Sequence, residues 1–248
     1  MNVRVRIILF LLLLISTSVF SQRWKRFRYE VFVATGPSIL NGDLGGANRP
    51  GRHFLSDIDI LSTRYFFSLG GRYKIREKFS FKLNFIFGRL YSSDTFTEYE
   101  PRAIRNVTSK TFFFEPSIHF EYSIIKERIG IRYTLQYLNR FKIRYVNTYV
   151  LIGIGGLTFN PRTENKDFIT NRNENFLKFQ GVLPLGIGFK YGINRLTTLS
   201  IEFIQRYTTT DYIDGFSDKY SKARDSYFTV NILVSRRLKT ARSGLPML

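Results

Sequence analysis

Two histidines in this sequence lie near carboxylates and could take part in catalysis. They are His119, close to Glu115 and Glu121, and His53, close to Asp57 and Asp59. A histidine can serve as the base that activates a serine, or it can work together with an acid. That chemistry requires a nucleophile, a base and an orienting group held together in space. Whether these residues meet the requirement depends on the elements that carry them.

Aspartates and glycines are the second kind of candidate. Two groups of aspartates could offer oxygen ligands to a hard cation: Asp43, Asp57 and Asp59, and Asp211, Asp214 and Asp218. Their spacing matches no EF-hand loop, so ordinary polar loop residues are the simpler interpretation. The glycines of GDLGG (42–46) and GIGG (153–156) precede no predicted helix, and turns or close strand packing explain them better than a phosphate cradle. The sequence therefore predicts no metal ion and no cofactor.

The elements that must position these residues are β-strands, because apolar and polar residues alternate along most of the chain. Residues 79–91 read FSFKLNFIFGRLY, with Phe or Leu at every odd position from Phe79 to Phe87 and Ser80, Lys82 and Asn84 between them. Period two over ten or more residues indicates a strand with two different environments. The pattern predicts eight strands, at 27–36, 63–75, 79–91, 112–124, 146–159, 177–191, 197–207 and 226–236.

The length and spacing of these strands favour a membrane barrel over a soluble sandwich. Most are eleven to fifteen residues long, which suits a tilted crossing of about 25–30 Å, whereas sandwich strands are typically shorter. Long polar loops alternate with tight turns, and in outer-membrane barrels the long loops face outward. The long loops are 41–62, 92–110, 160–175 and 208–225, and the tight turns are 76–78 and 192–195. We therefore expect an all-β, eight-stranded, antiparallel up-and-down transmembrane barrel with both termini in the periplasm.

The first 21 residues resemble an export signal, which the outer-membrane location requires. Arg4 and Arg6 form a positive segment, an apolar run follows, and Val19 and Ser21 fit a cleavage site before Gln22. The apolar run is short for a membrane span, although an N-terminal anchor helix is the alternative. Residues 22–248 then form one barrel domain. The chain has no cysteine, so neither a lipid-attachment cysteine nor a disulfide is expected.

One segment, 125–145, departs from this plan because it is long where a tight periplasmic turn is expected. Part of it, 129–137, alternates well enough to be a strand. A ninth crossing would put the termini on opposite sides of the membrane, against the usual even number of strands. We expect a periplasmic excursion instead, either a hairpin extension or an amphipathic piece at the membrane interface.

The polar faces of the strands should form a charged network inside the barrel. Its expected members are Glu30, Arg64, Arg72, Lys82, Glu115, His119, Glu121, Lys178, Glu202 and Arg206, with Lys74 and Lys190 on the same faces. Opposite charges in so narrow a space should pair and close the barrel to solutes, because an unpaired buried charge is costly. A histidine inside a filled barrel is more often a hydrogen-bonding residue than a catalyst, so the sequence predicts no enzyme.

The net charge of +19 needs a different explanation from nucleic-acid binding. The export signal and the lack of an interleaved Gly/aromatic RNA-binding motif argue against that partner. The expected periplasmic side carries eighteen Lys and Arg against Glu77 and Glu127. These cations could contact lipid phosphates, or they could dock an acidic protein. The candidate docking residues are Arg128, Arg132, Arg140, Lys142 and Arg144 of the 125–145 segment.

Four stretches, in order along the chain, carry a family resemblance: GDLGGAN (42–48), TRYFFSLGGRYKI (63–75), LPLGIGFKYGIN (183–194) and TDYIDGFSDKY (210–220). They resemble the small outer-membrane barrels of Bacteroidetes-type bacteria, a family that includes PorG of the type IX secretion system. The most specific residues are in two expected loops: Gly42, Asp43, Gly45, Gly46, Asp211, Tyr212 and Asp214. The resemblance implies an eight-stranded barrel and, for a PorG-like member, association with periplasmic ring proteins of the secretion machine.

Three functions thus remain open from the sequence. The first is a non-enzymatic barrel that anchors or stabilises a periplasmic protein assembly. The second is a passive pore or small-ligand barrel, and the third is a barrel enzyme that modifies lipid. The expected partners are outer-membrane lipid and a periplasmic protein, with no nucleic acid.

Overall fold

The computed structural model describes residues 23–42, 44, 62–94, 107–127, 146–164, 177–215, 224–241 and 243–247. Within them lie eight long strands: β1 (Tyr29–Asn41), β2 (Arg64–Lys74), β3 (Phe79–Ser93), β4 (Thr108–Ser123), β5 (Val146–Glu164), β6 (Phe179–Gly192), β7 (Thr197–Thr208) and β8 (Ser226–Thr240). A short 3-10 helix, η2 (Arg23–Arg26), precedes β1, and a two-residue strand, β9 (Pro246–Met247), follows β8. The expected signal segment, 1–21, lies outside the described residues.

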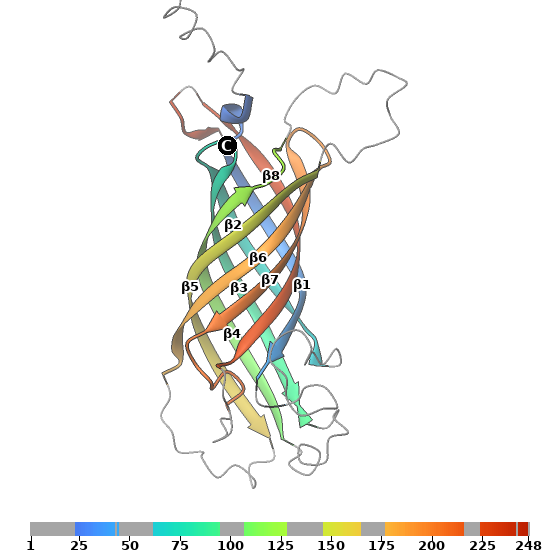
Figure 1. Cartoon of the computed structure of the whole chain (residues 1–248), viewed down its shortest axis with the longest axis vertical. Helices are drawn as coiled ribbons and strands as arrows, with labels where there is room; N and C mark the ends of the chain where they lie inside the picture. Colours follow the sequence, from blue (N-terminus) through green and yellow to red (C-terminus); the bar gives the residue numbers. More distant parts are fainter. Residues whose placement is uncertain are drawn as a thin grey trace, which may run out of the picture.

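The eight strands close into a barrel. Each strand pairs antiparallel with the next in the chain, and β1 pairs antiparallel with β8, with Val33 opposite Val234. Figure 1 shows the tilted strands wrapped into a barrel. The prediction of an eight-stranded, antiparallel up-and-down barrel is therefore confirmed. β9 adds only a short pairing with Lys239 and Thr240 at the end of β8.

The two ends of the barrel differ, and we name them by what they carry. The terminus end, uppermost in Figure 1, carries η2, the turns at 75–78 and 193–196, and the C-terminal residues. At the opposite loop end, β1, β3, β5 and β7 finish and the strands that follow them begin. The four connections expected to be long loops therefore all join strands at the loop end.

Apolar side chains face outward and polar side chains face inward along the strands. Phe81, Leu83 and Phe87 of β3 are 45–47% exposed, whereas Lys82 and Asn84 between them are fully buried. This is the reverse of a soluble protein, in which large apolar residues are buried and Lys is almost never fully buried unless paired. The arrangement suits a barrel whose outer surface contacts hydrocarbon.

Several strands are longer at the loop end than the sequence predicts. β1 continues to Asn41 instead of ending at 36, and β5 continues to Glu164, so that 160–164 is strand and not loop. The backbone pairs there, such as Lys110 with Arg162, continue beyond the apolar part of the outer surface. Polar residues on the outward face made this part of β5 look like a loop in the sequence.

The loop-end half of the interior contains an apolar cluster. Its members come from most strands of the barrel and from the connection after β7: Leu40, Phe66, Ile86, Leu90, Phe113, Leu157, Phe159, Val182, Ile213 and Tyr227. All of them are at most 7% exposed. Apolar side chains thus fill the interior near the loop end, and the charged side chains described next lie together with smaller apolar clusters over the rest of its length.

Candidate functional site

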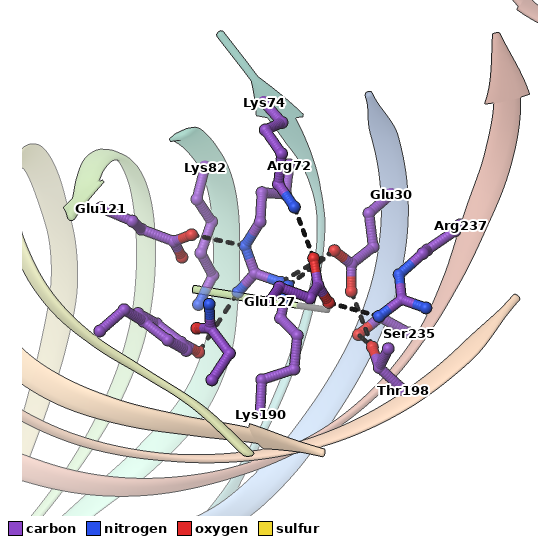
Figure 2. A network of polar contacts seen from close by, with 12 residues as sticks. Glu30, Arg72, Lys74, Lys82, Glu121, Glu127, Lys190, Thr198, Ser235 and Arg237 are labelled. Carbon is purple, nitrogen blue, oxygen red and sulfur yellow. Dashed lines mark hydrogen bonds and ion pairs between the residues drawn. The ribbon is translucent and has the colours of Figure 1, made fainter. Parts of the chain in front are cut away.

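Arg72 of β2 is the centre of a buried ion-pair network inside the barrel. Its guanidinium lies 3.2 Å from Glu30 of β1, 2.6 Å from Glu121 of β4 and 3.3 Å from Glu202 of β7. These strands lie on different sides of the barrel, so one side chain ties several walls together (Figure 2). A planar guanidinium with five donors is suited to such a junction.

Glu202 accepts hydrogen bonds from two further side chains besides Arg72. The Lys82 ammonium lies 2.5 Å from Glu202 Oε2, and the Tyr149 hydroxyl donates to Glu202 Oε1 at 2.6 Å. Lys82 and Glu202 are both fully buried. A buried ion pair is stable only when geometry and added hydrogen bonds offset the loss of water, and Glu202 has both.

Glu30 carries the network towards β6, β7 and β8. Lys190 lies 2.9 Å from Glu30 Oε2, and the Thr198 hydroxyl donates to Oε1 at 2.8 Å. Thr198 is in turn hydrogen-bonded to Ser235 at 2.9 Å (Figure 2). Because β1 and β8 pair to close the barrel, these contacts stabilise the junction of the two strands from the inside.

A separate pair lies nearer the loop end. The Arg206 guanidinium is 2.9 Å from Glu115, and both side chains are fully buried. Tyr227 also donates to Glu115, and Arg206 donates to the Thr229 hydroxyl. This pair lies next to the apolar cluster, since Tyr227 belongs to both.

His119 faces inward beside this network. Its Nε2 atom lies 3.0 Å from the Ser117 hydroxyl on the same strand, and both residues are buried. A Cβ on Gly153 of β5 would lie 2.5 Å from the imidazole, so the GIGG glycine leaves room for that ring. The serine and histidine are thus close together, but both are packed inside the wall, where a lipid substrate would have to displace neighbouring side chains.

Glu127 closes the terminus end of the barrel. It follows β4, yet its carboxylate lies 2.5 Å from Lys74 at the end of β2 and also pairs with Arg237 of β8. In an eight-stranded barrel β4 and β8 lie on opposite sides, so residues 124–127 reach across the barrel mouth (Figure 2). Arg237 also donates to the backbone carbonyl of Arg195 at 2.9 Å, which ties in the turn between β6 and β7.

The charge of Glu127 is stabilised by its neighbours. Burial by itself would raise the pKa of this carboxyl, but the cations Lys74, Lys190 and Arg237 outweigh burial and hold the pKa well below its ordinary value of 4.5. The side chain is only 7% exposed. Glu127 is therefore an anion that locks the start of the β4–β5 connection into the barrel mouth.

Some of the charges counted on the expected periplasmic side are not exposed in the basic rim around the barrel mouth. Lys74, Arg237 and Glu127 lie inside the mouth and are paired with one another, so they are not part of the outer surface. Exposed cations that surround the mouth are Lys25, Arg26, Arg76, Lys126, Arg195, Arg236 and Lys239. Lys126 forms an exposed pair with Glu77 at 2.8 Å. The docking candidates Arg128, Arg132, Arg140, Lys142 and Arg144 lie outside the described residues.

Two residues expected in the interior network lie elsewhere. Lys178 is exposed and precedes the first residue of β6, so its assignment to the interior is wrong. The Arg64 side chain is half-buried at the start of β2, where its guanidinium lies 3.9 Å from the ring centroid of Tyr91. Both positions are at strand ends, where alternation has too few residues to define a face. The other expected members are buried: Glu30, Arg72, Lys82, Glu115, His119, Glu121, Glu202 and Arg206.

Some of the family-like loop residues form buried hydrogen bonds at the loop end. Asp214 is buried and accepts a hydrogen bond from the backbone of Leu44 at 3.1 Å. Asp225, which was not expected as a site residue, accepts one from Ile213 at 2.8 Å. A Cβ on Gly42 would lie within 3 Å of both carboxylates, so a larger residue there would displace at least one of them. Asp211 and Tyr212 follow β7, whereas Asp43, Gly45 and Gly46 lie outside the described residues, as do His53, Asp57, Asp59 and Asp218.

Within the ranges that the structure describes, no group of three or more His, Asp or Glu side chains could hold a metal ion. Sequence reasoning missed several members of the network, among them Tyr149, Glu127 and Arg237. Tyr149 has the inward parity of its strand, which was a usable signal. Glu127 gave no such signal, because a side chain that folds back from a turn leaves no periodicity.

In comparisons with known proteins, this chain is similar to others in structure only. No protein-family model and no curated protein sequence matches this chain. Among solved structures, Neisserial surface protein A is similar with 8% identity and a TM-score of 0.49, covering 84% of this chain and 96% of that one. Ail of Yersinia pestis has 11% identity and a TM-score of 0.42, covering 86% and 99%. The outer membrane enzyme PagL has 10% identity and a TM-score of 0.31, covering 83% and 97%.

Proposed function

We propose that this protein is a non-enzymatic outer-membrane β-barrel that anchors or stabilises a periplasmic protein assembly at its terminus end. The specific form of the proposal is a PorG-like component of a type IX secretion system. That form is supported by the family resemblance of the loop and strand stretches in the sequence. The partner would present an acidic surface to the basic terminus end.

The outer surface supports a membrane location. Outward residues of β4 from Phe112 to Tyr122 are apolar or aromatic and rise about 25 Å along the barrel axis, given about 3.4 Å per residue and a tilt of about 40°. Ile118, Ile152 and Ile154 are 51–71% exposed. Such a continuous apolar belt would be unstable in water and suits hydrocarbon. No helix among the described residues is long and apolar enough to cross a membrane.

The observation that carries the anchoring proposal is the clamp formed by Glu127, Lys74 and Arg237. It fixes the start of the β4–β5 connection across the barrel mouth through buried ion pairs. The 128–145 stretch that follows carries Arg128, Arg132, Arg140, Lys142 and Arg144. A basic segment that leaves from a fixed point is suited to docking, because less freedom is lost when a partner binds.

A passive pore or small-ligand barrel is the alternative, and the filled interior weighs against it. The Arg72 network, the Arg206–Glu115 pair and the apolar cluster occupy successive levels between the two ends. Eight strands leave an interior that side chains can fill. The alternative predicts steady ion conductance of the purified protein in planar bilayers, whereas the filled interior predicts none.

The experiment that tests the proposal is capture of periplasmic partners by the membrane-inserted protein. Chemical cross-linking in intact cells, followed by purification of the barrel, should recover an acidic periplasmic protein. The association should weaken as salt is raised, because exposed charges are screened within about 10 Å at 0.1 M salt. Recovery of no periplasmic protein at low salt would contradict the anchoring role.

A further inference from the structure

A cluster of cations lies on the outer surface near the loop end, on one side of the barrel. Arg89 of β3, Lys110 of β4 and Arg162 of β5 are exposed and have the outward parity of their strands. Lys110 lies directly opposite Arg162 in the strand pairing, and Arg89 lies opposite Phe112, one outward position from Lys110. Directly opposite Cβ atoms are about 5 Å apart, and diagonal ones about 7–8 Å. Three positive charges therefore gather within a small area.

Two arginines lie over aromatic rings at this cluster. The Arg89 guanidinium lies 4.4 Å from the ring centroid of Phe112, and that of Arg64 lies 3.9 Å from the ring centroid of Tyr91. Tyr91 lies opposite Lys110, so both stacked pairs border the same area. The planar N–H fork of a guanidinium matches the geometry of a phosphate. Arg64 also donates a hydrogen bond to the backbone carbonyl of Thr63 at 2.7 Å, so it borders the cluster as an already anchored cation.

The cluster lies at the border of the apolar belt. Phe87 and Phe114 stack with ring centroids 4.7 Å apart, directly below Arg89 and Phe112 on the same strands. The belt thus ends where the cations begin, which is the depth at which the headgroup of a lipid meets its acyl chains. An acyl chain could lie on the phenylalanines while its headgroup meets the cations.

Within the strands, the outward cations near the loop end are confined to this side of the barrel. In their loop-end halves, the outward faces of β6, β7, β8 and β1 carry no Lys or Arg within the strands. Among the side chains that the structure describes, the outward faces of β2 to β4, and of β5 as far as Arg162, carry no carboxylate. A general attraction to anionic lipid would need no such one-sided arrangement.

We propose that Arg89, Lys110 and Arg162, with Arg64 beside them, form a binding site for the phosphate of a phosphorylated lipid headgroup. The lipid belongs to the leaflet at the loop end, and its acyl chains lie on Phe87, Phe112 and Phe114. This inference rests on the membrane location proposed above, but it does not depend on the anchoring of a periplasmic partner.

Native mass spectrometry of the full-length protein in detergent tests the site. The probes are diphosphorylated lipid A, the same lipid without its phosphates, and inorganic phosphate. The protein should retain the phosphorylated lipid, and the triple variant Arg89→Gln, Lys110→Gln, Arg162→Gln should bind it at least about tenfold more weakly, because it loses several charge-assisted hydrogen bonds. Arg89→Lys, which keeps the charge but loses the planar fork, should bind a few-fold more weakly.

The matched control is Arg224→Gln, which removes an exposed loop-end cation that precedes β8, away from the cluster. It should bind the phosphorylated lipid as the parent does. Equal binding by the triple variant, or equal binding of the lipid without phosphates, would overturn the site. Inorganic phosphate that binds as tightly as the lipid would overturn the assignment to a lipid. Recovery of the periplasmic partner should be unchanged in the triple variant, so the two proposals can fail separately.

Discussion

Lys74 Nζ lies 2.5 Å from Glu127 Oε2, and both side chains are less than a tenth exposed. The pair joins the end of β2 to a residue that follows β4. With Arg237 of β8 as a second partner, it makes the β4–β5 connection part of the barrel mouth. This contact links the fold to the proposed docking segment.

Glu127→Gln should destabilise the barrel by about 3 kcal/mol, because it leaves two buried cations without their anion. Reversible urea unfolding in phospholipid vesicles, followed by circular dichroism, measures the change. The control is Glu77→Gln at the same end, whose pair with Lys126 is about half exposed and should contribute within about 1 kcal/mol. Equal effects of the two substitutions would show that the clamp adds nothing beyond a surface pair.

The contribution of Glu127 should also depend on pH in a defined direction. Its pKa in the folded protein is depressed, so the contribution is complete above the ordinary pKa of 4.5 and is lost as the pH falls below that value. The difference in unfolding free energy between the parent and Glu127→Gln should be constant from pH 7 to about pH 5 and narrow below pH 4.5. A difference that stays constant down to pH 3 would refute the depressed pKa.

The buried pair of Lys82 and Glu202 should behave as a unit. Glu202→Met alone leaves the Lys82 ammonium uncompensated and should cost about 3 kcal/mol or more. The double variant with Lys82→Met should be less destabilised than the sum of the single variants by at least about 1 kcal/mol. Urea unfolding of the four proteins gives this coupling, and additive effects would mean that the pair is not an interacting unit.

Alternation in the sequence was enough to predict the wall of the barrel and most of its interior. Lys82, Glu121 and Glu202 lie on strands whose opposite faces are apolar, so their inward direction followed from period two. The pairing partners did not follow, because Arg72 contacts carboxylates from strands on several sides. Those contacts depend on the curvature of the closed barrel and not on spacing along the chain.

The ends of the strands and the side chains of turns were harder to predict. Lys178 has the right parity but precedes β6, and β5 runs to Glu164 through a polar stretch that looks like a loop. Beyond the lipid belt, both faces of a strand meet polar surroundings, so the alternation disappears although the backbone pairing continues. Glu127 and Asp225 enter the interior from connections, where no periodicity indicates direction.

The orientation in the membrane can be tested with single cysteines, since the chain contains none of its own. A cysteine in place of Asn48, Ala103 or Asn165 should react with a membrane-impermeant maleimide in intact cells, because these positions lie in connections at the loop end. A cysteine in place of Glu77, which is exposed at the terminus end, should react only after the outer membrane is opened. Labelling of the Glu77 position in intact cells would place the termini outside and reverse the account.

The anchoring role is tested most directly by reversing the charge of the β4–β5 connection. The variant carries Arg128→Glu, Arg132→Glu, Arg140→Glu and Lys142→Glu, and its matched control carries four reversals at exposed rim cations: Lys25→Glu, Arg26→Glu, Arg195→Glu and Lys239→Glu. Both proteins should insert. None of the four rim cations is a lipid-facing residue of the described barrel wall, and the other four residues follow β4 in the chain.

The measurement is the amount of periplasmic partner that cross-links to each inserted barrel and co-purifies with it. The account predicts a loss of about tenfold or more for the connection variant and a much smaller loss for the rim control. If the connection variant inserts and retains its partner in full, the docking role is wrong and the cations serve only to hold the barrel in the membrane.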